Sequence, residues 1–309
     1  PIYSAALCRG RSNGRFVERG AATTAEVEVP HRIRIKQRSA TSWLRRLRYR
    51  LSRLTGARLQ KSQRIYVVEI NGHRFKRTIQ PDSYTAECIE RSLEAFAESD
   101  RLPGVAIQYE RELWVEFIDG ERLKSADGEV VRAVAELFSI LHRNNPRLVA
   151  TDETRFGARL RRSLRFLHRV GVLNADVYAD LREAAQRLQP TSVWVGYEYT
   201  DAILKNFIVA ADDGRTCAID VESLAADELI GMGYAKASQF WLGEYKAEFL
   251  EHLSGHGGPD FRPYLPFVEL YFLSQWMQRA FIEQKWRFVD ASRFERFRGP
   301  IDRDGQGAP

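Results

Sequence analysis

The stretch "YTDAILKNFIVAADDGRTCAIDVES", residues 199–223, places three polar side chains around two short apolar runs. Asp201 and Asn206 bracket the first run, and Asp220 follows the second. Carboxylate and amide oxygens are ligands for Mg²⁺, so a loop with Asp201 and Asn206 beside a strand that delivers Asp220 could hold this cation. Each residue alone could instead cap a turn or end a strand. The three in this order favour a functional site.

The part of the chain before this stretch is rich in strand patterns. "RIYVVEINGHRFKRTIQ", residues 64–80, has two strand-like runs around Asn71-Gly72, the pair that a type I′ hairpin turn prefers. "DSYTAECIERSLEAFAES" has the apolar spacing of a helix, and "GVAIQYERELWVEFIDGERL" predicts two more strands.

After about residue 125 the pattern becomes mainly helical, with candidates at 128–143, 152–169 and 174–188 and several between 225 and 295. The exception is residues 192–223, which predict one hairpin embedded among helices. The sequence therefore predicts an α+β chain with a sheet-rich region over 25–118 and a helical region over 119–298. The terminal segments 1–24 and 299–309 are predicted to be flexible.

The composition is that of an ordinary globular protein, with 44% apolar and 28% charged residues in a chain of 309. No apolar run reaches the roughly 20 residues that a membrane span needs. The three cysteines, Cys8, Cys88 and Cys217, are scattered, and the first residues lack a signal-peptide pattern. These features predict a cytoplasmic protein with reduced thiols.

The net charge of +6 is concentrated in residues 31–64, which hold twelve Lys or Arg and no acid. Apolar residues recur on one stripe of this segment, so residues 42–54 are predicted to form a basic amphipathic helix. Such a segment can attract phosphates, including those of an anionic membrane at whose inner face the protein would be peripheral. Nucleic acid is not expected as a partner, because the segment has little aromatic interleaving and no recognised motif.

The stretch 199–223 resembles the catalytic and metal loops of the aminoglycoside phosphotransferase and choline kinase-like families, which have a protein-kinase-like fold. The family pattern is His-Gly-Asp-x4-Asn followed by Ile-Asp-aromatic-Glu, and here it is Tyr199-Thr200-Asp201-x4-Asn206 followed by Ile219-Asp220-Val221-Glu222. "WVEFIDGERL" resembles the hinge of the family and "ELFSILHR" its Leu-His-bearing helix. "NFIV" is also similar to bacterial kinases of lipopolysaccharide core sugars.

The resemblance implies a two-lobed fold, with an antiparallel sheet and one helix in the first lobe and a mainly helical second lobe. It implies an ATP- and Mg²⁺-dependent kinase that phosphorylates a hydroxyl of a small molecule, sugar or glycolipid. In that case Asp201 would orient or deprotonate the acceptor hydroxyl, and Asn206 and Asp220 would bind Mg²⁺. Glu116 and Phe117 would lie at the hinge that holds the nucleotide.

The same resemblance requires a basic residue on the strand before the first helix, paired with an acid on that helix. Lys76 fits by side-chain type, whereas Arg77 fits by its apolar neighbours, because Phe75 shares its face of the sheet. We prefer Lys76. Glu87 is the expected acidic partner, and Glu90 is the alternative.

Two departures from the family pattern leave a second interpretation open. Tyr199 stands where the family has histidine, and no Gly-rich loop precedes the hairpin at residues 64–80. A pseudokinase that binds or scaffolds is therefore the alternative to an active kinase. The basic segment "TRFGARLRRSLRFLHR", together with residues 31–64, suggests an anionic acceptor or an acceptor at an anionic membrane surface.

Overall fold

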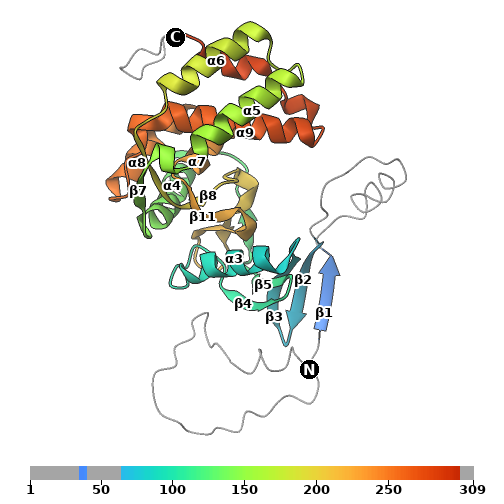
Figure 1. Ribbon diagram of the computed structural model, residues 1–309. Coiled ribbons are helices and arrows are strands. Elements are labelled where there is room, and N and C mark those ends of the chain that lie inside the picture. The colour runs from blue at the N-terminus through green and yellow to red at the C-terminus, as the bar shows by residue number, and fades with distance from the viewer. Residues whose placement is uncertain (1–34, 40–63, 300–309) are drawn as a thin grey trace, which may run out of the picture. The chain divides into compact units, whose positions relative to one another are not determined.

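The computed structural model describes residues 35–39 and 64–299 (Figure 1). The predicted helix 42–54, the segment 1–24 and residues 300–309 lie outside the described residues, as does most of the basic segment 31–64. The contacts within the chain divide it into two compact units. The N-terminal unit comprises residues up to Glu94 together with Pro103–Ile118, and the C-terminal unit comprises Ala95–Leu102 and the chain from Asp119 onward.

The N-terminal unit is built on one antiparallel sheet with the strand order β1-β2-β3-β5-β4. Asn71 and Gly72, with φ of +52° and +86°, form the turn of its central hairpin, which confirms the predicted turn. The register places Val68 opposite Phe75 across this hairpin. The strands are β1 (Ile35–Ser39), β2 (Arg64–Ile70), β3 (His73–Ile79), β4 (Val105–Tyr109) and β5 (Glu112–Glu116).

Helix α3 (Ser83–Glu94) packs against β4 and β5 and buries Ala86, Ile89 and Leu93. It begins after Asp82, whose carboxylate accepts a hydrogen bond from the Thr85 N–H at 2.7 Å. A separate apolar cluster occupies one face of the sheet and consists of Tyr66, Val68, Ile70, Phe75, Ile107 and Trp114. Among the described residues no member of α3 belongs to this cluster, so α3 covers the opposite face.

The C-terminal unit is mainly helical. Helix α4 begins after its capping residue Asp127, whose side chain accepts a hydrogen bond from the Val130 N–H at 2.9 Å. The buried Phe138 of α4 packs edge-on against Phe249 of α8. None of the helices in the described part of the chain has the length and apolar character that a bilayer crossing requires. The helices are α4 (Gly128–Arg143), α5 (Phe156–Arg169), α6 (Ala175–Arg187), α7 (Met232–Phe240), α8 (Lys246–Gly255) and α9 (Leu265–Ile282).

Two small antiparallel sheets interrupt the helices, with strand orders β10-β9-β6 and β11-β8-β7. The sequence predicted one hairpin over residues 192–223, whereas only β9 and β10 form it and β8 belongs to the second sheet. The partners of β8 are hard to recognise, because β7 is short and β11, "LAADEL", lacks β-branched residues. The strands are β6 (Gly120–Arg122), β7 (Arg147–Ala150), β8 (Ser192–Tyr199), β9 (Phe207–Ala210), β10 (Thr216–Ala218) and β11 (Leu224–Leu229).

The structure also corrects the expected extent of the N-terminal region. The sequence placed residues 25–118 together, whereas Ala95–Leu102 belongs to the C-terminal unit. The reason is hydrogen bonding: the Ala218 N–H donates to the carbonyl of Arg101 at 3.0 Å, and the Asn144 amide donates to the carbonyl of Ala95 at 2.8 Å. Together the elements form antiparallel sheets followed by a helical body, as the predicted α+β class requires.

Gly233, which has no side chain, allows α7 to pack closely against Phe138 and the backbone of Tyr199. A Cβ atom on Gly233 would lie 2.5 Å from Cζ of Phe138 and 2.6 Å from the carbonyl oxygen of Tyr199. We expect Gly233→Ala to lower the free energy of unfolding by about 1–3 kcal/mol, because overpacking forces these groups apart. Thermal unfolding measures the effect. Gly255→Ala is the matched control, since a Cβ there meets nothing within 4 Å, and an equal loss in both variants would contradict the prediction.

Candidate active site

The candidate catalytic loop begins where β8 ends. Tyr199, the last residue of β8, is fully buried, and the Thr200 N–H donates to the carbonyl of Ser223 at 2.8 Å. The carbonyl of Asp201 accepts a hydrogen bond from the Ile203 N–H at 2.8 Å, which folds the chain back directly after the carboxylate. The Asp201 side chain remains 42% exposed, so a ligand can reach it.

The Asn206 amide contacts the carboxylates of both Asp201 and Asp220. Its amide nitrogen Nδ2 lies 3.2 Å from Oδ2 of Asp201 and 3.4 Å from Oδ2 of Asp220, and it also donates to the carbonyl of Asp201 at 2.9 Å. The side chain is held in a buried position. The structure therefore brings the three residues of the sequence motif together around one amide group.

Asp220 is held at the end of β10 by Tyr199 and Ser223. Its backbone N–H donates to the Tyr199 hydroxyl at 3.2 Å, and the Ser223 hydroxyl donates to its Oδ2 at 3.2 Å. Burial, and next the Asp220 carboxylate, raise the pKa of Tyr199 well above its ordinary value, so the phenol stays neutral. Tyr199, which stands where the aminoglycoside phosphotransferase and choline kinase-like families have histidine, thus supports the loop that carries Asp220.

The donor set suits a hard divalent cation. With Nδ2 of Asn206 directed at Asp201, its amide oxygen is the atom that could bind a cation together with the Asp220 carboxylate. No group of three or more His, Cys, Asp or Glu in the described part of the chain could hold a metal ion. Magnesium commonly uses one or two carboxylates with phosphate and water completing its shell, so Asn206 and Asp220 fit Mg²⁺ bound to a nucleotide.

Lys236 completes the surroundings of Asp201 and was not predicted from the sequence. Its Nζ lies 3.1 Å from Oδ1 of Asp201, so each oxygen of this carboxylate has its own donor. The lysine comes from α7, and its Nζ lies 4.6 Å from the ring centroid of Phe240. Burial lowers the pKa of Lys236, and the charge of Asp201 opposes that change. No sequence pattern links the residue to Asp201, because the two meet only when α7 packs against β8.

A buried pair connects the helix that bears the Leu-His motif with the catalytic loop. Nε2 of His142, at the end of α4, lies 3.2 Å from Oε2 of Glu198, and both side chains are fully buried. The same carboxylate accepts hydrogen bonds from the Gly231 N–H at 2.7 Å and the Tyr199 N–H at 2.9 Å. Glu198 thereby fixes the start of the catalytic loop relative to the residues that precede α7.

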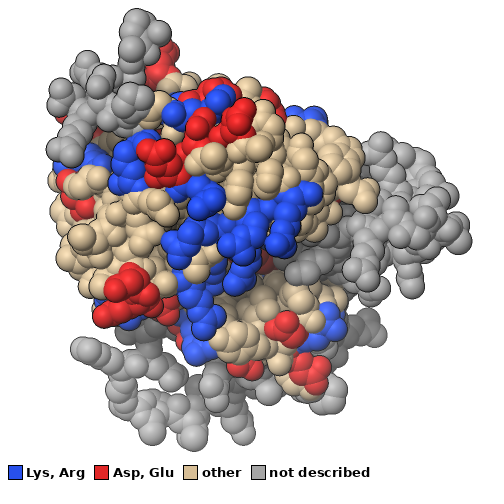
Figure 2. Space-filling view, turned by 45° about the horizontal axis from the view of Figure 1, so that its top comes forward, with Lys and Arg blue, Asp and Glu red and all other residues tan. Residues whose placement is uncertain are grey.

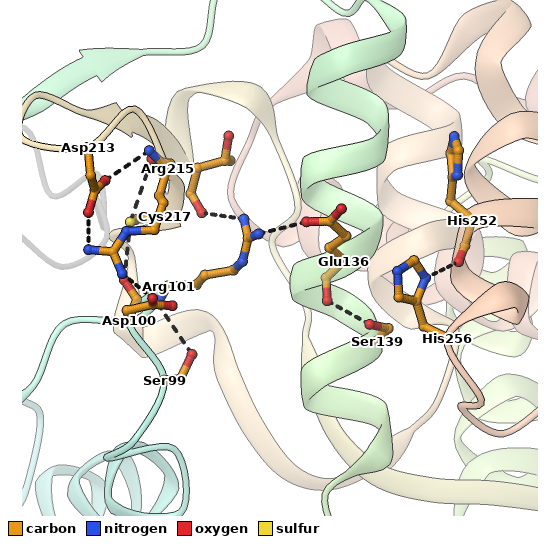
Figure 3. Close-up of polar contacts among 11 residues, drawn as sticks. Ser99, Asp100, Arg101, Glu136, Ser139, Asp213, Arg215, Cys217, His252 and His256 are labelled. Carbon is orange, nitrogen blue, oxygen red and sulfur yellow. Dashed lines mark hydrogen bonds and ion pairs between the residues drawn. The ribbon is translucent and has the colours of Figure 1, made fainter.

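The hairpin that presents Asp220 is anchored by Arg101 (Figure 3). The Arg101 guanidinium donates to Glu136 of α4 at 2.6 Å and to the carbonyl of Thr216 at 3.4 Å. Its own carbonyl accepts from Ala218, two residues before Asp220. Contacts of Thr216 and Ala218 with Arg101 therefore fix the strand that leads to Asp220.

Arg215 forms a second anchor in the same view. Its guanidinium pairs with Asp213 in the β9–β10 turn and with Asp100 in the segment 95–102. The Cys217 thiol donates to the carbonyl of Asp100 at 3.5 Å. These contacts attach the segment 95–102 to the hairpin and explain why it belongs to the C-terminal unit.

In the N-terminal unit, Arg77 is engaged within its own sheet. Its Nε donates to Glu112 on β5 at 2.9 Å, a second guanidinium nitrogen binds the same carboxylate, and this pairing lowers the pKa of Glu112. Its guanidinium also lies 5.4 Å from the ring centroids of Tyr66 and Trp114. Arg77 therefore lies on the face of the apolar cluster and binds a neighbouring strand.

Lys76 lies on the opposite face, the one that α3 covers. The register places it between Val67 and Val115. On α3, Glu87 is exposed, whereas Glu90 is half-buried and burial raises its pKa. Of the two acids, Glu90 is therefore the less exposed, and the contact of Lys76 with a nucleotide stays a prediction. The pairing itself stays a prediction.

Glu116 is the last residue of β5, and Phe117 follows it just before the end of the N-terminal unit at Ile118. The Glu116 N–H donates to the carbonyl of Gly104 at 2.9 Å, and its carboxylate accepts from the Gly104 N–H at 3.2 Å. The Phe117 ring lies under the Arg74 guanidinium, 4.2 Å from its centroid. A hinge role and nucleotide binding by the two residues stay predictions.

No family model matches the sequence, and no curated protein matches it significantly. Solved structures do resemble this fold. The structure resembles macrolide 2'-phosphotransferase MphH from Brachybacterium faecium with a TM-score of 0.55 and 12% identity, over 77% of this chain and 89% of that one. It also resembles choline kinase LicA from Streptococcus pneumoniae, with a TM-score of 0.54 and 12% identity, over 83% of this chain and 98% of that one.

The ADP-bound aminoglycoside phosphotransferase APH(2'')-Ib gives a TM-score of 0.50 and 12% identity, over 81% of this chain and 98% of that one. These neighbours are phosphotransferases and kinases of one protein-kinase-like family, the family that residues 199–223 resemble. At such low identity the likeness establishes the fold, and this chain has the protein-kinase-like fold of the aminoglycoside phosphotransferases and choline kinases.

Proposed function

We propose that this protein is an ATP- and Mg²⁺-dependent kinase that transfers a phosphoryl group to a hydroxyl of a small molecule, sugar or glycolipid. The observation that carries the proposal is the contact of one Asn206 amide with both Asp201 and Asp220, at 3.2 and 3.4 Å. A carboxylate for the acceptor and oxygen ligands for a cation are the protein groups that phosphoryl transfer needs. The fold supports the same activity.

In this mechanism Asp201 orients the acceptor hydroxyl and accepts its proton. Its two oxygens have separate donors, Lys236 and Asn206, so the carboxylate is held in one orientation before the acceptor arrives. Asn206 and Asp220 would hold the Mg²⁺, which when bound neutralises charge on the nucleotide phosphates. Tyr199 and Ser223 keep Asp220 in place through their hydrogen bonds.

On the nucleotide side, Lys76 would contact the ATP phosphates, with an acid of α3 as its partner. Glu116 and Phe117 would contact the adenine from the end of β5. A cytoplasmic location, with contact to an anionic membrane surface through residues 31–64, stays a prediction, because nearly all of that segment lies outside the described residues.

A thermal-shift experiment tests nucleotide and metal binding without knowledge of the acceptor. ATP with Mg²⁺ is expected to raise the melting temperature of the full chain, whereas ATP with a chelator has a smaller effect. A ligand at 100 times its Kd adds about 2.7 kcal/mol to the free energy of unfolding, which is easily measured. Equal shifts with and without Mg²⁺ would exclude the proposed metal site.

A further inference from the structure

The surroundings of Asp201 are cationic and aromatic on the side formed by α7 and α9. Lys236 is only 12% exposed, and its Nζ lies 5.7 Å from the ring centroid of Phe272 on α9. Trp276, one turn along α9 from Phe272, packs on Phe240 of α7 with ring centroids 5.2 Å apart. Aromatic rings on two helices therefore flank the ammonium that binds Asp201.

Two further cations lie on and just after the last turn of α9. Arg279 lies two turns after Phe272 on α9, so the two side chains share one face of the helix. Arg279 pairs with Glu283 at 3.4 Å, and Lys285 binds the same carboxylate, whose side chain is 8% exposed. Burial lowers the pKa of Lys236 most, and the positive charges of Arg279 and Lys285 lower this pKa further. Among the described residues, Asp201 is the one acid paired with Lys236.

We propose that the acceptor is an alcohol that also carries an anionic group, a phosphate or a carboxylate, and that Lys236, Arg279 and Lys285 bind this group beside Asp201. The proposal rests on the proposed kinase function and names the substrate class of its acceptor site. The Lys236 ammonium has three N–H donors, so it can keep Asp201 as one partner and donate to an acceptor anion with another.

The same side chains argue against a cationic acceptor. Choline, ethanolamine and aminoglycosides, the substrates named for several structural neighbours, are cations at neutral pH. If the acceptor hydroxyl is bound at Asp201, an ammonium group of the same acceptor would lie near the Lys236 ammonium. A contact between like charges in a partly desolvated site is unfavourable. This chain therefore shares its fold with kinases of cationic alcohols, but the Lys236 ammonium beside Asp201 disfavours such an acceptor here.

The positive charge extends beyond the immediate site. Helix α5 packs against α9, and the Gln275 amide of α9 donates to the carbonyl of Arg159 at 3.2 Å. Residues 154–175 contain no acid, and α5 with the residue before it exposes Arg155, Arg159, Arg161, Arg162, Arg165 and Arg169. Figure 2, in which the top of Figure 1 is turned forward, shows Lys and Arg side chains gathered on one face. Such a field raises the local concentration of anionic ligands.

A series of alcohols that differ in charge tests the proposal with the full chain, Mg²⁺ and ATP. The series compares glycerol, glycerate, glycerol 3-phosphate, ethanolamine and choline, and likewise glucose, glucuronate, glucose 6-phosphate and glucosamine. We expect kcat/KM for an anionic member to exceed that of its neutral counterpart by about tenfold or more, and amines not to react. The two anionic arms show whether the site takes phosphate or carboxylate.

Charge reversal then assigns the effect to residues. Arg279→Glu, which does not touch Asp201, is expected to raise KM for the anionic acceptor more than it lowers kcat. Lys236→Glu is expected to remove the preference for the anion, and Lys236→Arg to retain it. Arg182→Glu reverses an exposed charge on α6 and serves as the control with an unchanged acceptor preference. These ratios between acceptors cancel any general loss of activity.

Thermal-shift titration with the same alcohols in the absence of nucleotide separates this proposal from the proposed function. Failure of ATP and Mg²⁺ to bind would remove the kinase assignment, whereas the alcohol titration would still report selection of anions. The proposal is overturned if the parent protein phosphorylates or binds the amines as well as the acids. It is also overturned if no anionic alcohol binds or reacts, or if Lys236→Glu and Arg279→Glu leave the preference unchanged.

Discussion

Replacement of Asp201 by Asn is expected to lower the turnover of an acceptor about 10²- to 10⁴-fold, the usual contribution of a general base. The amide keeps the size of the side chain and one hydrogen-bond acceptor but loses the charge that accepts the proton. Affinity for ATP with Mg²⁺ should change little, because Asn206 and Asp220 remain as ligands. Steady-state kinetics and isothermal titration on the same preparations measure the two quantities separately.

The control for this variant is Asp212→Asn, an exposed aspartate in the β9–β10 turn of the same hairpin, which should keep full activity. Undiminished turnover in Asp201→Asn would remove Asp201 from catalysis. A parent protein that binds ATP but phosphorylates no alcohol of a broad series would instead support the pseudokinase interpretation.

Asp220→Ala is expected to abolish the Mg²⁺-dependent part of nucleotide binding. The variant removes the carboxylate whose Oδ2 lies 3.4 Å from the Asn206 amide, so only one predicted protein ligand remains for the cation. The difference in melting temperature between ATP with Mg²⁺ and ATP with a chelator should disappear.

The proposed adenine contacts, Glu116 and Phe117, are unchanged in this variant, so weak metal-independent binding of ATP to Asp220→Ala should persist. Circular dichroism checks that the fold is retained. Asp212→Ala, in the same hairpin, should keep the Mg²⁺ response of the parent. If Asp220→Ala binds and turns over ATP like the parent, Asp220 only ends a strand and the metal assignment is wrong.

The elements that were predicted correctly have local signals. Asn71-Gly72 specifies its turn by backbone conformation, and Asp127 starts α4 at the expected residue through a side-chain cap. The grouping of Asp201, Asn206 and Asp220 was also predictable, since a short loop and one hairpin are enough to bring them together. In each case the information lies within about 25 residues of sequence.

What was not predicted depends on packing between distant segments. Lys236 reaches Asp201 only because Gly233 lets α7 approach Tyr199 and Phe138 closely, and no spacing rule encodes that approach. The choice between Glu87 and Glu90 depends on how α3 is rotated on the sheet. The propensities of single strands could not show that β8 pairs with β7 and β11, because cross-strand partners decide such pairing.

The segment Ala95–Leu102 has a consequence for how the chain is made and how it can be divided. It leaves the ribosome before the rest of the C-terminal unit, yet the partners of Asp100 and Arg101 include Arg215 and Ala218. During synthesis, the contacts of Asp100 and Arg101 with Arg215 and Ala218 can form only after the β9–β10 hairpin has been made. A fragment that starts at Asp119 would lack the backbone acceptor of Ala218 and the counter-ion that Asp100 offers to Arg215. A cut after Ile118 would therefore leave residues 95–102 of the C-terminal unit on the N-terminal fragment.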